Sequence, residues 1–431
     1  MSQKKLITYR GIYKRCIKRH KFDEFIVSLS VRLYVDSGCG FRSVVKILSL
    51  LNDLLDWRSS NLPCANTISG WVQKSGYKIY KTPVKGSHEA NYALILDESM
   101  MVGSGRLLLT LKTPAQALQH RPLSWQDVQV VNMSVKERWD AKSIALSLEK
   151  TIKLVGKPPA YIISDNDTKL KKAIHLLDLP RIADVGHTLA LCLENTYKKE
   201  ADFKEYMKKL SDLRFKALMT PAYYLLPPSQ RTIARFMNLN SVIKWSERML
   251  VSVDKLGQEK ETFLFVKEYA SLIDELSESF SVVEFINTTL KQQGFNQQRQ
   301  KMLNRYVSKT LFSGNTRQQV LALRIKDYLA QQGQKIKLPD KNLYVSSDLV
   351  ESFFSVYKKR KAPNPLYGVT PFILLLPLLT QKSRYKQSEY KEALEGVFYQ
   401  ILSAREKIIY LRIRLLKELK VWPLNTFYNS F

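Results

Sequence analysis

The fold of this chain is decided by three apolar stretches, YALILDES at 92–99, GRLLLTLKTP at 105–114 and DVQVVNMSV at 127–135. Each is short, rich in strand-favouring residues and bounded by polar residues, a pattern typical of β-strands. A different period follows at 141–156, where AKSIALSLEKTIKLVG predicts an amphipathic helix closed by a terminal glycine. A fourth strand is predicted for PAYIISDND at 159–167.

Three further segments complete this region. They predict a helix for TKLKKAIHLL at 168–177, a short fifth strand for RIADVGH at 181–187 and another helix for TLALCLENTYKK at 188–199. Residues 90–200 therefore predict the first part of an α/β (α+β) domain. Its centre is a mixed five-stranded sheet with flanking helices.

Residues 1–85 predict an all-helical N-terminal unit. Amphipathic stretches cover 21–38 and 41–57, with a tight turn at Gly38–Gly40, and CANTISGWVQKSGY at 64–77 predicts a short third helix. Three helices of this kind in a basic segment predict a DNA-binding helix-turn-helix. The alternative is a plain three-helix cap on the next domain. The residues expected to contact DNA are Asn66, Thr67, Ser69 and Lys74.

The rest of the chain is predicted to be helical. Residues 201–340 are rich in Leu, Lys, Glu and Gln, with little strand signal, and predict an all-helical insertion. Residues 341–431 hold SSDLVESFFSVYKKRK at 346–361, followed by basic, apolar helices. PFILLLPLL at 371–379 is too short to span a bilayer, which takes about 20 residues, and predicts a buried segment packed against the sheet.

The net charge points to a polyanionic partner. The 431 residues include 68 Lys and Arg against 39 Asp and Glu, a formal charge of +29. Membrane-surface binding usually concentrates such charge in one amphipathic helix. Here residues 1–90 carry 16 basic against 6 acidic residues, and residues 355–420 carry 14 against 5. Two basic regions interleaved with aromatics predict nucleic-acid binding through more than one part of the chain.

Cysteine usage and the N-terminal sequence exclude several classes of protein. The 4 cysteines, at 16, 39, 64 and 192, form no closely spaced pair, which argues against a zinc ribbon or a disulfide scaffold and suits a reducing cytoplasm. The sequence begins without the apolar run of a signal peptide. We therefore expect a cytoplasmic protein that does not enter a membrane.

Three carboxylates are the candidate catalytic residues. Asp97 ends the first predicted strand, Asp165 ends the fourth, and Glu351 lies in the first turn of a predicted helix. Acids gathered in a protein that binds a polyanion would repel its phosphates unless a cation lies between them. Mg²⁺ prefers a few carboxylates, waters and substrate phosphates, and two such ions can clamp both oxygens of a phosphoryl displacement.

Each carboxylate has an alternative reading. The neighbour Glu98 could be the functional acid in place of Asp97. Asp167 competes with Asp165, although it also suits a helix N-cap. Glu351 follows Asp348 at the spacing of a capping box, so its role could be local.

The order of strands and helices, with two Asp at strand ends and a Glu on a later helix, resembles the ribonuclease-H-like fold of DDE transposases and retroviral integrases. The likeness covers residues 91–199 and 341–365. The helical stretch between them is similar to the insertion domain of several DDE transposases. One subgroup has Tyr, Arg and a basic residue seven before, four before and seven after its Glu. Tyr344 and Lys358 match, whereas Ser347 replaces the Arg and removes one expected phosphate contact.

The resemblance implies a bacterial-type DDE transposase, located with the nucleoid. In such an enzyme Asp97 bridges two Mg²⁺ ions, for which Mn²⁺ can substitute, while Asp165 holds one and Glu351 the other. The enzyme cuts a DNA strand at the end of a mobile element, and the released 3′-OH attacks target DNA. A homodimer or larger synaptic complex holds two double-stranded ends together.

Further residues are candidates for supporting roles. DNA-backbone contacts are expected from Lys358, Lys359, Arg360 and Tyr344. His187, Asp184 and Trp245 are candidates for support of the site, although core packing is the simpler role for Trp245. Two other functions compete: a ribonuclease-H-like nuclease or resolvase that does not join strands, and a DNA-binding protein derived from a transposase.

Overall fold

A five-stranded sheet forms the centre of the molecule. The computed structural model describes residues 21–54, 61–81, 91–98, 105–117, 121–229, 236, 239–257, 259–335, 342–360 and 371–381. The strands are β1 (Tyr92–Glu98), β2 (Arg106–Pro114), β3 (Gln129–Lys136), β4 (Tyr161–Ser164) and β5 (Arg181–Ala183). Their order in the sheet is β3-β2-β1-β4-β5. The first three strands pair antiparallel, and β4 and β5 run parallel to β1.

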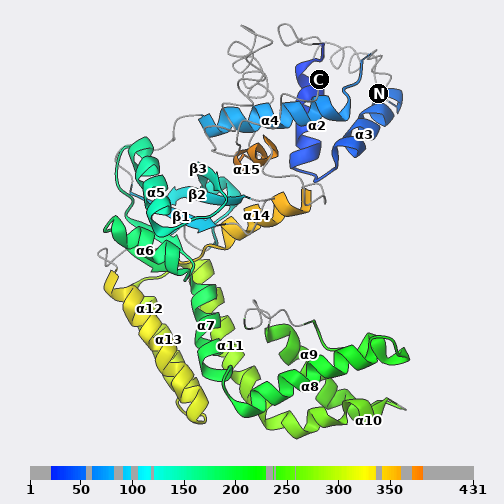
Figure 1. Cartoon of the computed structure of the whole chain (residues 1–431), viewed down its shortest axis with the longest axis vertical. Helices are drawn as coiled ribbons and strands as arrows, with labels where there is room; N and C mark the ends of the chain where they lie inside the picture. The colour runs from blue at the N-terminus through cyan, green and yellow to red at the C-terminus, as the bar shows by residue number, and fades with distance from the viewer. Residues whose placement is uncertain are drawn as a thin grey trace, which may run out of the picture.

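The two faces of the sheet are covered by different helices, because residues of a strand alternate between faces. Leu94 and Leu96 pack with apolar residues of α5 (Ala141–Val155) and α6 (Thr168–Leu176). Ala93 and Ile95 belong to the larger core on the other face. There α14 (Asp348–Arg360) contacts β1 and α15 (Leu375–Leu379) contacts β3 (Figure 1).

This arrangement confirms the predicted fold class. The strands and helices between residues 91 and 199 occur in the predicted order and close to the predicted bounds, ending with α7 (Val185–Tyr197). Gly156 has a φ of 91° at the C-terminus of α5, the left-handed conformation expected there. The core is an α/β domain with a ribonuclease-H-like mixed sheet.

The described part of the N-terminal unit contains three helices, α2 (Glu24–Val35), α3 (Phe41–Leu54) and α4 (Ala65–Lys81). The turn before α3 is where the sequence predicted it, and Gly38 has a φ of 74° that suits glycine. The third helix has 17 residues and so is longer than expected. Its apolar side rests on α15 and on the short 3₁₀ helix η6 (Pro371–Leu374), with Gly76 against the Leu374 carbonyl.

The predicted insertion is entirely helical in its described parts. A long helix, α11 (Ala270–Gln293), returns beside α7 and connects two arms that extend away from the sheet (Figure 1). One arm contains α8 (Ala201–Ala217), η2 (Pro221–Leu225), α9 (Leu239–Ser252), η4 (Val253–Lys255), α10 (Lys260–Phe263) and η5 (Leu264–Tyr269). The other is the hairpin of α12 (Gln297–Leu311) and α13 (Thr316–Lys335).

The C-terminal part returns to the N-terminal unit. The stretch at 371–379 is buried, as predicted, and forms η6 and α15 between α4 and the sheet. The predicted basic helices beyond residue 381 lie outside the described residues. Among the helices of the described part, none is long and apolar enough to cross a membrane.

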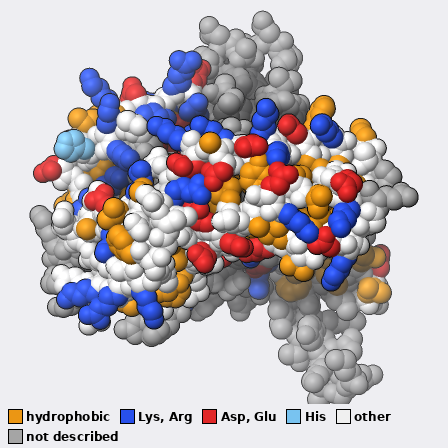
Figure 2. Space-filling view, turned by 90° about the horizontal axis from the view of Figure 1, so that it is seen from below, with side chains coloured by type: hydrophobic (Ala, Val, Ile, Leu, Met, Phe, Trp, Pro, Cys, Tyr) orange, Lys and Arg blue, Asp and Glu red, His pale blue; other side chains and the backbone are white. Residues whose placement is uncertain are grey.

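Charge is unevenly distributed on the side of the insertion. Figure 2 shows this face with Lys and Arg interspersed among apolar side chains, while Asp and Glu gather near its middle. Positive charge therefore forms no single continuous patch on this face of the described molecule.

Candidate active site

Asp97 and Asp165 lie on neighbouring parallel strands. Leu96 of β1 pairs with Ser164 of β4, so the two aspartates are the next residues along adjacent strands. Asp97 shares a face with Ile95, and Asp165 continues the face of Ile163, which faces the same core as Ile95. The sheet thus brings both carboxylates to its carboxyl edge on the side of α14.

Glu98 points to the opposite face. Its two carboxylate oxygens pair with Arg106 Nη1 at 3.0 Å and Lys169 Nζ at 2.7 Å. A carboxylate neutralised by two cations has little free capacity for a metal ion. The geometry therefore favours Asp97 over Glu98.

The loop of Asp165 is fixed by several hydrogen bonds. Asp167 caps α6 by accepting from Lys169 N at 2.6 Å, as predicted, and donates its own N–H to Asp165 Oδ1 at 2.9 Å. Arg181 at the start of β5 donates to Ser164 Oγ at 2.8 Å and to the Asp165 carbonyl. The loop is therefore held from both sides.

Glu351 lies on α14, on the same side of the sheet. The helix begins at Asp348, so Glu351 is its fourth residue, one beyond the position that a capping box uses. Asp348 instead pairs with Lys291 Nζ of α11 at 2.5 Å. On the next residue of α14, Ser352 Oγ accepts from Trp125 Nε1 at 3.2 Å. Capping therefore does not account for Glu351.

The electrostatics of the three carboxylates are coupled. Burial and the charge of Asp165 raise the pKa of Asp97 to about 8, with a further contribution from Glu351. Burial also raises the pKa of Glu351, against the opposing effect of His187. The all-oxygen donor set of these acids has the chemistry that a hard divalent cation such as Mg²⁺ or Mn²⁺ prefers. Within the described parts of the chain, however, no three His, Cys, Asp or Glu side chains lie close enough together to hold a metal ion, so the acids influence one another's pKa without forming a closed metal site.

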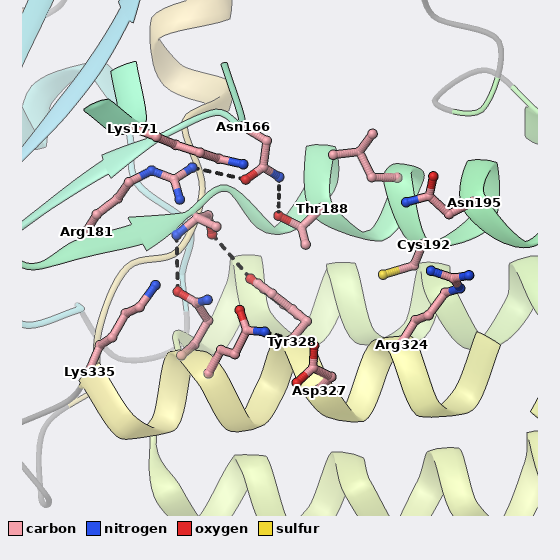
Figure 3. A pocket seen from close by; sticks show the side chains of 14 residues that line it. Asn166, Lys171, Arg181, Thr188, Cys192, Asn195, Arg324, Asp327, Tyr328 and Lys335 are labelled. Carbon is pink, nitrogen blue, oxygen red and sulfur yellow. Dashed lines mark hydrogen bonds between the residues drawn. The ribbon is translucent and has the colours of Figure 1, made fainter. Parts of the chain in front are cut away.

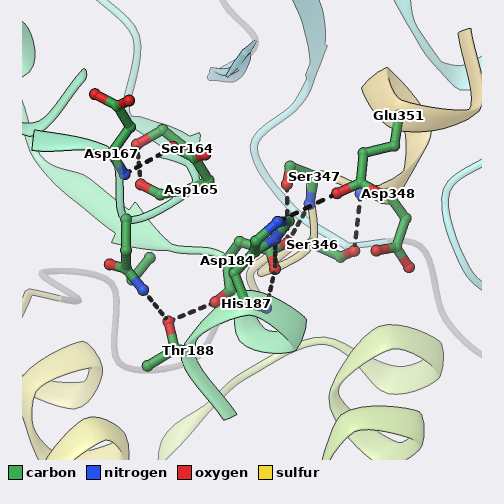
Figure 4. Close-up of polar contacts among 12 residues, drawn as sticks. Ser164, Asp165, Asp167, Asp184, His187, Thr188, Ser346, Ser347, Asp348 and Glu351 are labelled. Atoms are coloured by element: carbon green, nitrogen blue, oxygen red, sulfur yellow. Dashed lines mark hydrogen bonds and ion pairs between the residues drawn. The ribbon is translucent and has the colours of Figure 1, made fainter. Parts of the chain in front are cut away.

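Asp184 and His187 connect the sheet to Glu351 (Figure 4). His187 Nδ1 lies 3.0 Å from Asp184 Oδ1, and His187 Nε2 lies 3.5 Å from Glu351 Oε1. The hydrogen bond to Asp184 raises the pKa of His187 to about 9 despite burial, so the imidazole is protonated near neutral pH. It stands as a cation between two carboxylates.

Ser347 completes the surroundings of Asp184. Its N–H and Oγ both donate to Asp184 Oδ2, at 2.6 and 3.0 Å. Burial would raise the pKa of Asp184, but hydrogen bonds from His187 and Ser347 lower it. The residue that replaces the Arg of the family signature is therefore a buried structural contact.

The structure corrects the prediction for Tyr344. Its side chain is only 4% exposed, so it is not available to DNA in this structure. The reason is that the segment after residue 341 passes through the core: Leu343 pairs with Phe295, and Tyr344 N donates to the Tyr161 hydroxyl at 3.0 Å.

The basic end of α14 divides into two roles. Lys358 and Lys359 are exposed, and Lys358 lies two helical turns beyond Glu351 on nearly the same side. Arg360 turns instead to the N-terminal unit, 4.9 Å above the ring of Tyr34, with Nη2 donating to the Val35 carbonyl at 3.3 Å. The DNA contact predicted for Arg360 is therefore replaced by a contact within the chain.

The candidate recognition residues of the N-terminal unit lie on α4. Asn66 is exposed, and Thr67 Oγ1 lies 3.2 Å from Cys64 Sγ. Ser69 Oγ accepts from Gln73 Nε2 at 3.2 Å, and burial lowers the pKa of Lys74. The first turn of α4 is thus the more accessible part of this set.

Trp245 is a core residue of the insertion. It is 7% exposed on α9, and its Nε1 donates to the Leu225 carbonyl at 2.9 Å. α9 also lies in the arm that extends away from the sheet (Figure 1). The supporting role predicted for Trp245 is therefore not compatible with its position, and the simpler reading of core packing holds.

Sequence comparisons give no relative. The chain matches no protein family and no curated protein. Among solved structures its fold is similar to "Drosophila P element transposase strand transfer complex", with 16% sequence identity, a TM-score of 0.46, and coverage of 90% of this chain and 100% of that one. A likeness of this level says nothing about the chemistry of the protein, which depends on the residues of the site.

Sequence reasoning missed two groups that fix the site. Arg181 holds the Asp165 loop, and Lys291 ties α11 to the start of α14. Neither residue stands in a recognisable motif, because each acts across a distance in the sequence that only the fold closes.

Proposed function

We propose that this protein is a DNA transposase that cuts and joins DNA strands with divalent cations held by Asp97, Asp165 and Glu351. The observation that carries the proposal is the pairing of Leu96 with Ser164, which supports a shared site at the carboxyl edge of β1 and β4 beneath α14. Three acids on one side of a sheet in a chain of charge +29 suit a metal-dependent reaction on a polyanion.

Each side chain has a defined task in this proposal. The charges of Asp165 and Glu351 both act on Asp97. Asp97 would therefore contact both cations, while Asp165 and Glu351 would each hold one. Bound cations would activate the attacking water or 3′-hydroxyl and neutralise charge on the scissile phosphate. His187, bonded to Asp184, orients Glu351 and keeps it from turning away from the sheet.

DNA binding would extend beyond the site. Lys358 and Lys359 are exposed farther along α14 and would contact phosphates. The accessible first turn of α4, with Asn66 and Thr67, is the candidate for recognition of the element's end. Concerted cutting of two ends calls for a pair of chains or a larger complex.

Strand cleavage and strand transfer on labelled DNA test the proposal. The substrate is a duplex whose end comes from the DNA flanking the gene, incubated with Mg²⁺ or Mn²⁺. Joined products are expected from the wild-type chain. Asp97→Asn, Asp165→Asn and Glu351→Gln should each lower cleavage by at least about 10³-fold while leaving DNA affinity unchanged.

The matched control is Glu98→Gln, which changes the neighbouring carboxylate on the other face and should retain cleavage. Cut but unjoined products would identify a nuclease, and DNA binding without cutting would identify a DNA-binding protein. Wild-type cleavage by any of the three site variants would remove that residue from the site.

A further inference from the structure

A cavity of about 410 Å³ lies beside the candidate active site, between the sheet and the insertion (Figure 3). Its walls come from α6, β5, α7 and α13. It borders the carboxylate site, because Asn166 follows Asp165 directly and Arg181 lines the cavity and also donates to the Asp165 carbonyl. None of the proposed metal ligands lines it.

The charge of the cavity is strongly positive. Four cationic side chains line it, against the single carboxylate of Asp327. The four cations are Lys171, Arg181, Arg324 and Lys335. Asp327 Oδ2 is engaged by Gln331 Nε2 at 2.8 Å. Among the described residues, neither Lys171 nor Lys335 has a carboxylate within ion-pair distance.

Two of these lysines have lowered pKa values because of burial and because they lie near other positive charges. Burial lowers the pKa of Lys335, and the charges of Arg181 and Lys171 lower it further. Burial and the charge of Arg181 lower the pKa of Lys171 as well, against the opposing charges of Asp165 and Asp167. The cavity holds more cations than carboxylates, and like charges gathered in this way destabilise the folded chain, so a bound anion would stabilise their arrangement.

The cavity is formed before any ligand enters. At its base, both polar backbone groups of Ala183 are bonded to α13: its N–H donates to Gln332 Oε1 at 3.1 Å and its carbonyl accepts from the Tyr328 hydroxyl at 3.3 Å. Asn166 Nδ2 donates to Thr188 Oγ1 at 2.9 Å across another wall. The insertion is thereby fixed to the sheet at this point.

The lining favours a phosphate of a nucleic-acid strand over a nucleotide recognised by its base. Tyr328 is the aromatic residue of the lining, and it is only 4% exposed, with its hydroxyl directed to Ala183. No ring among the described lining residues is therefore open for base stacking, whereas several amide and cationic donors are available to phosphate oxygens.

We propose that this cavity binds a backbone phosphate of the DNA strand engaged at the carboxylate site, with Lys171 and Lys335 as its principal ligands. Arg181 joins the two sites, because its Nε and Nη2 hold the Asp165 loop while its Nη1 donates to no described residue. The inference that the phosphate belongs to the DNA strand at the carboxylate site rests on the proposed function. The inference that the cavity binds an anion rests on the residues of the cavity alone.

The test measures equilibrium binding of a short fluorescein-labelled duplex to the full chain over a range of salt concentrations. Lys171→Gln/Lys335→Gln should weaken binding about fivefold or more at low salt and reduce the slope of log K against log salt by about one. The control Lys150→Gln/Lys172→Gln makes the same change of charge on exposed helix positions outside the cavity, and its slope should stay at the wild-type value.

Thermal unfolding without DNA checks the fold of both double variants. The cavity variant should melt at or above the wild-type temperature, because it removes repelling charges and no ion pair. Equal DNA-binding slopes for the two double variants would overturn the proposal. Inorganic pyrophosphate or ATP that binds the wild-type chain but not the cavity variant, with DNA binding unchanged, would overturn the strand assignment in favour of a free phosphate ligand.

Failure of the phosphate site can be distinguished from failure of the proposed function. A chain that cuts no DNA but still loses salt slope in the cavity variant would retain the phosphate site and lose the transposase proposal. Normal cleavage by the wild-type chain, together with a salt slope for the cavity variant equal to that of the wild type, would keep the transposase proposal and remove the phosphate site.

Discussion

Asp97 and Glu98 are neighbours with the same chemistry, yet the strand gives them opposite environments. Glu98 lies between Arg106 and Lys169, which neutralise it. Asp97 faces Asp165, and burial with that negative charge raises its pKa. An acid held where its charge is unfavourable is typical of a functional site, because the local energy cost is offset by the ligand.

Asp97→Asn should therefore stabilise the chain in the absence of metal. In EDTA near neutral pH its melting temperature should rise by about 2 °C or more, since Asn avoids both ionisation and proton uptake at this position. Mg²⁺ should raise the melting temperature of the wild-type chain and leave that of the variant unchanged. Glu98→Gln should keep the wild-type response to Mg²⁺. A full response to Mg²⁺ in Asp97→Asn would contradict metal binding by Asp97.

Ser347 shows how a departure from a family signature can be read physically. Its side chain is 2% exposed and donates to buried Asp184. Ser347→Ala should lower the free energy of unfolding by about 1–2 kcal/mol, because it removes one donor to a buried carboxylate. Ser347→Arg, which recreates the signature, should cost more, since there is no room for the longer side chain.

Urea denaturation of both Ser347 variants measures these costs. The control is Ser346→Ala, because Ser346 Oγ accepts from Asp348 N at 3.2 Å in an exposed position. Its effect should stay within about 0.5 kcal/mol. A stable Ser347→Arg chain would show that the side chain can leave the interior, as a DNA contact would require.

At the scale of elements, α14 is positioned by contacts from outside the sheet. The indole of Trp125, in the short 3₁₀ helix η1 (Trp125–Asp127), donates to Ser352 and packs 5.6 Å from the ring of Phe353. η1 is itself closed by Asp127, which accepts from Ser124 N at 2.9 Å. The helix that bears Glu351 therefore depends on a turn more than 200 residues earlier.

Asp127→Asn should weaken this turn in a pH-dependent manner. Burial would raise the pKa of Asp127, but hydrogen bonds from Arg121 and Ser124 outweigh it and lower the pKa to about 2. A lowered carboxyl pKa stabilises the fold above the unfolded value near 3.8, and this contribution is lost as the pH falls towards 2.

The expected cost of Asp127→Asn is about 1 kcal/mol at pH 7, and it should shrink below pH 4. Urea midpoints at pH 7 and pH 3 measure it. The control is Asp140→Asn, at the exposed N-cap of α5, which is remote from α14. Cleavage should fall with Asp127→Asn and not with Asp140→Asn; equal cleavage by both would show that η1 does not position α14.

At the scale of the whole molecule, Phe372 joins the N-terminal unit to the domain built around the sheet. Its ring centroid lies 6.4 Å from that of Tyr34 in α2, 6.5 Å from Phe41 in α3 and 5.7 Å from Tyr357 in α14. Arg360 adds a second link by its contact with Tyr34. A segment late in the chain thus covers the apolar side of the first helices.

Phe372→Ala should therefore cost about 2–3 kcal/mol and loosen the N-terminal unit from α14, because three ring contacts are lost together. Hydrogen exchange should increase in α2, α3 and α4 more than in the sheet. The matched control is Phe215→Ala, since Phe215 is 87% exposed and its loss should change stability by less than about 0.5 kcal/mol. Unchanged exchange in α2 would show that the unit is held by other contacts.

The sequence by itself determined the elements of the core and predicted the three acids of the candidate site. Strand and helix periods are local properties, so β1 to β5 and α5 to α7 could be predicted from residues 91–199. Asp97 and Asp165 were predicted by the same reasoning, because each is the first carboxylate after an apolar strand.

The tertiary structure alone decided which side chains are accessible and which partners they meet. Tyr344 and Arg360 looked available for DNA, and each is taken up by contacts with residues distant in sequence. Trp245, a candidate for support of the site, is likewise a core residue of the insertion. The placement of α15 under α4 likewise depends on residues about 300 positions apart. Burial and long-range pairing arise from chain closure in space, which local periodicity does not encode.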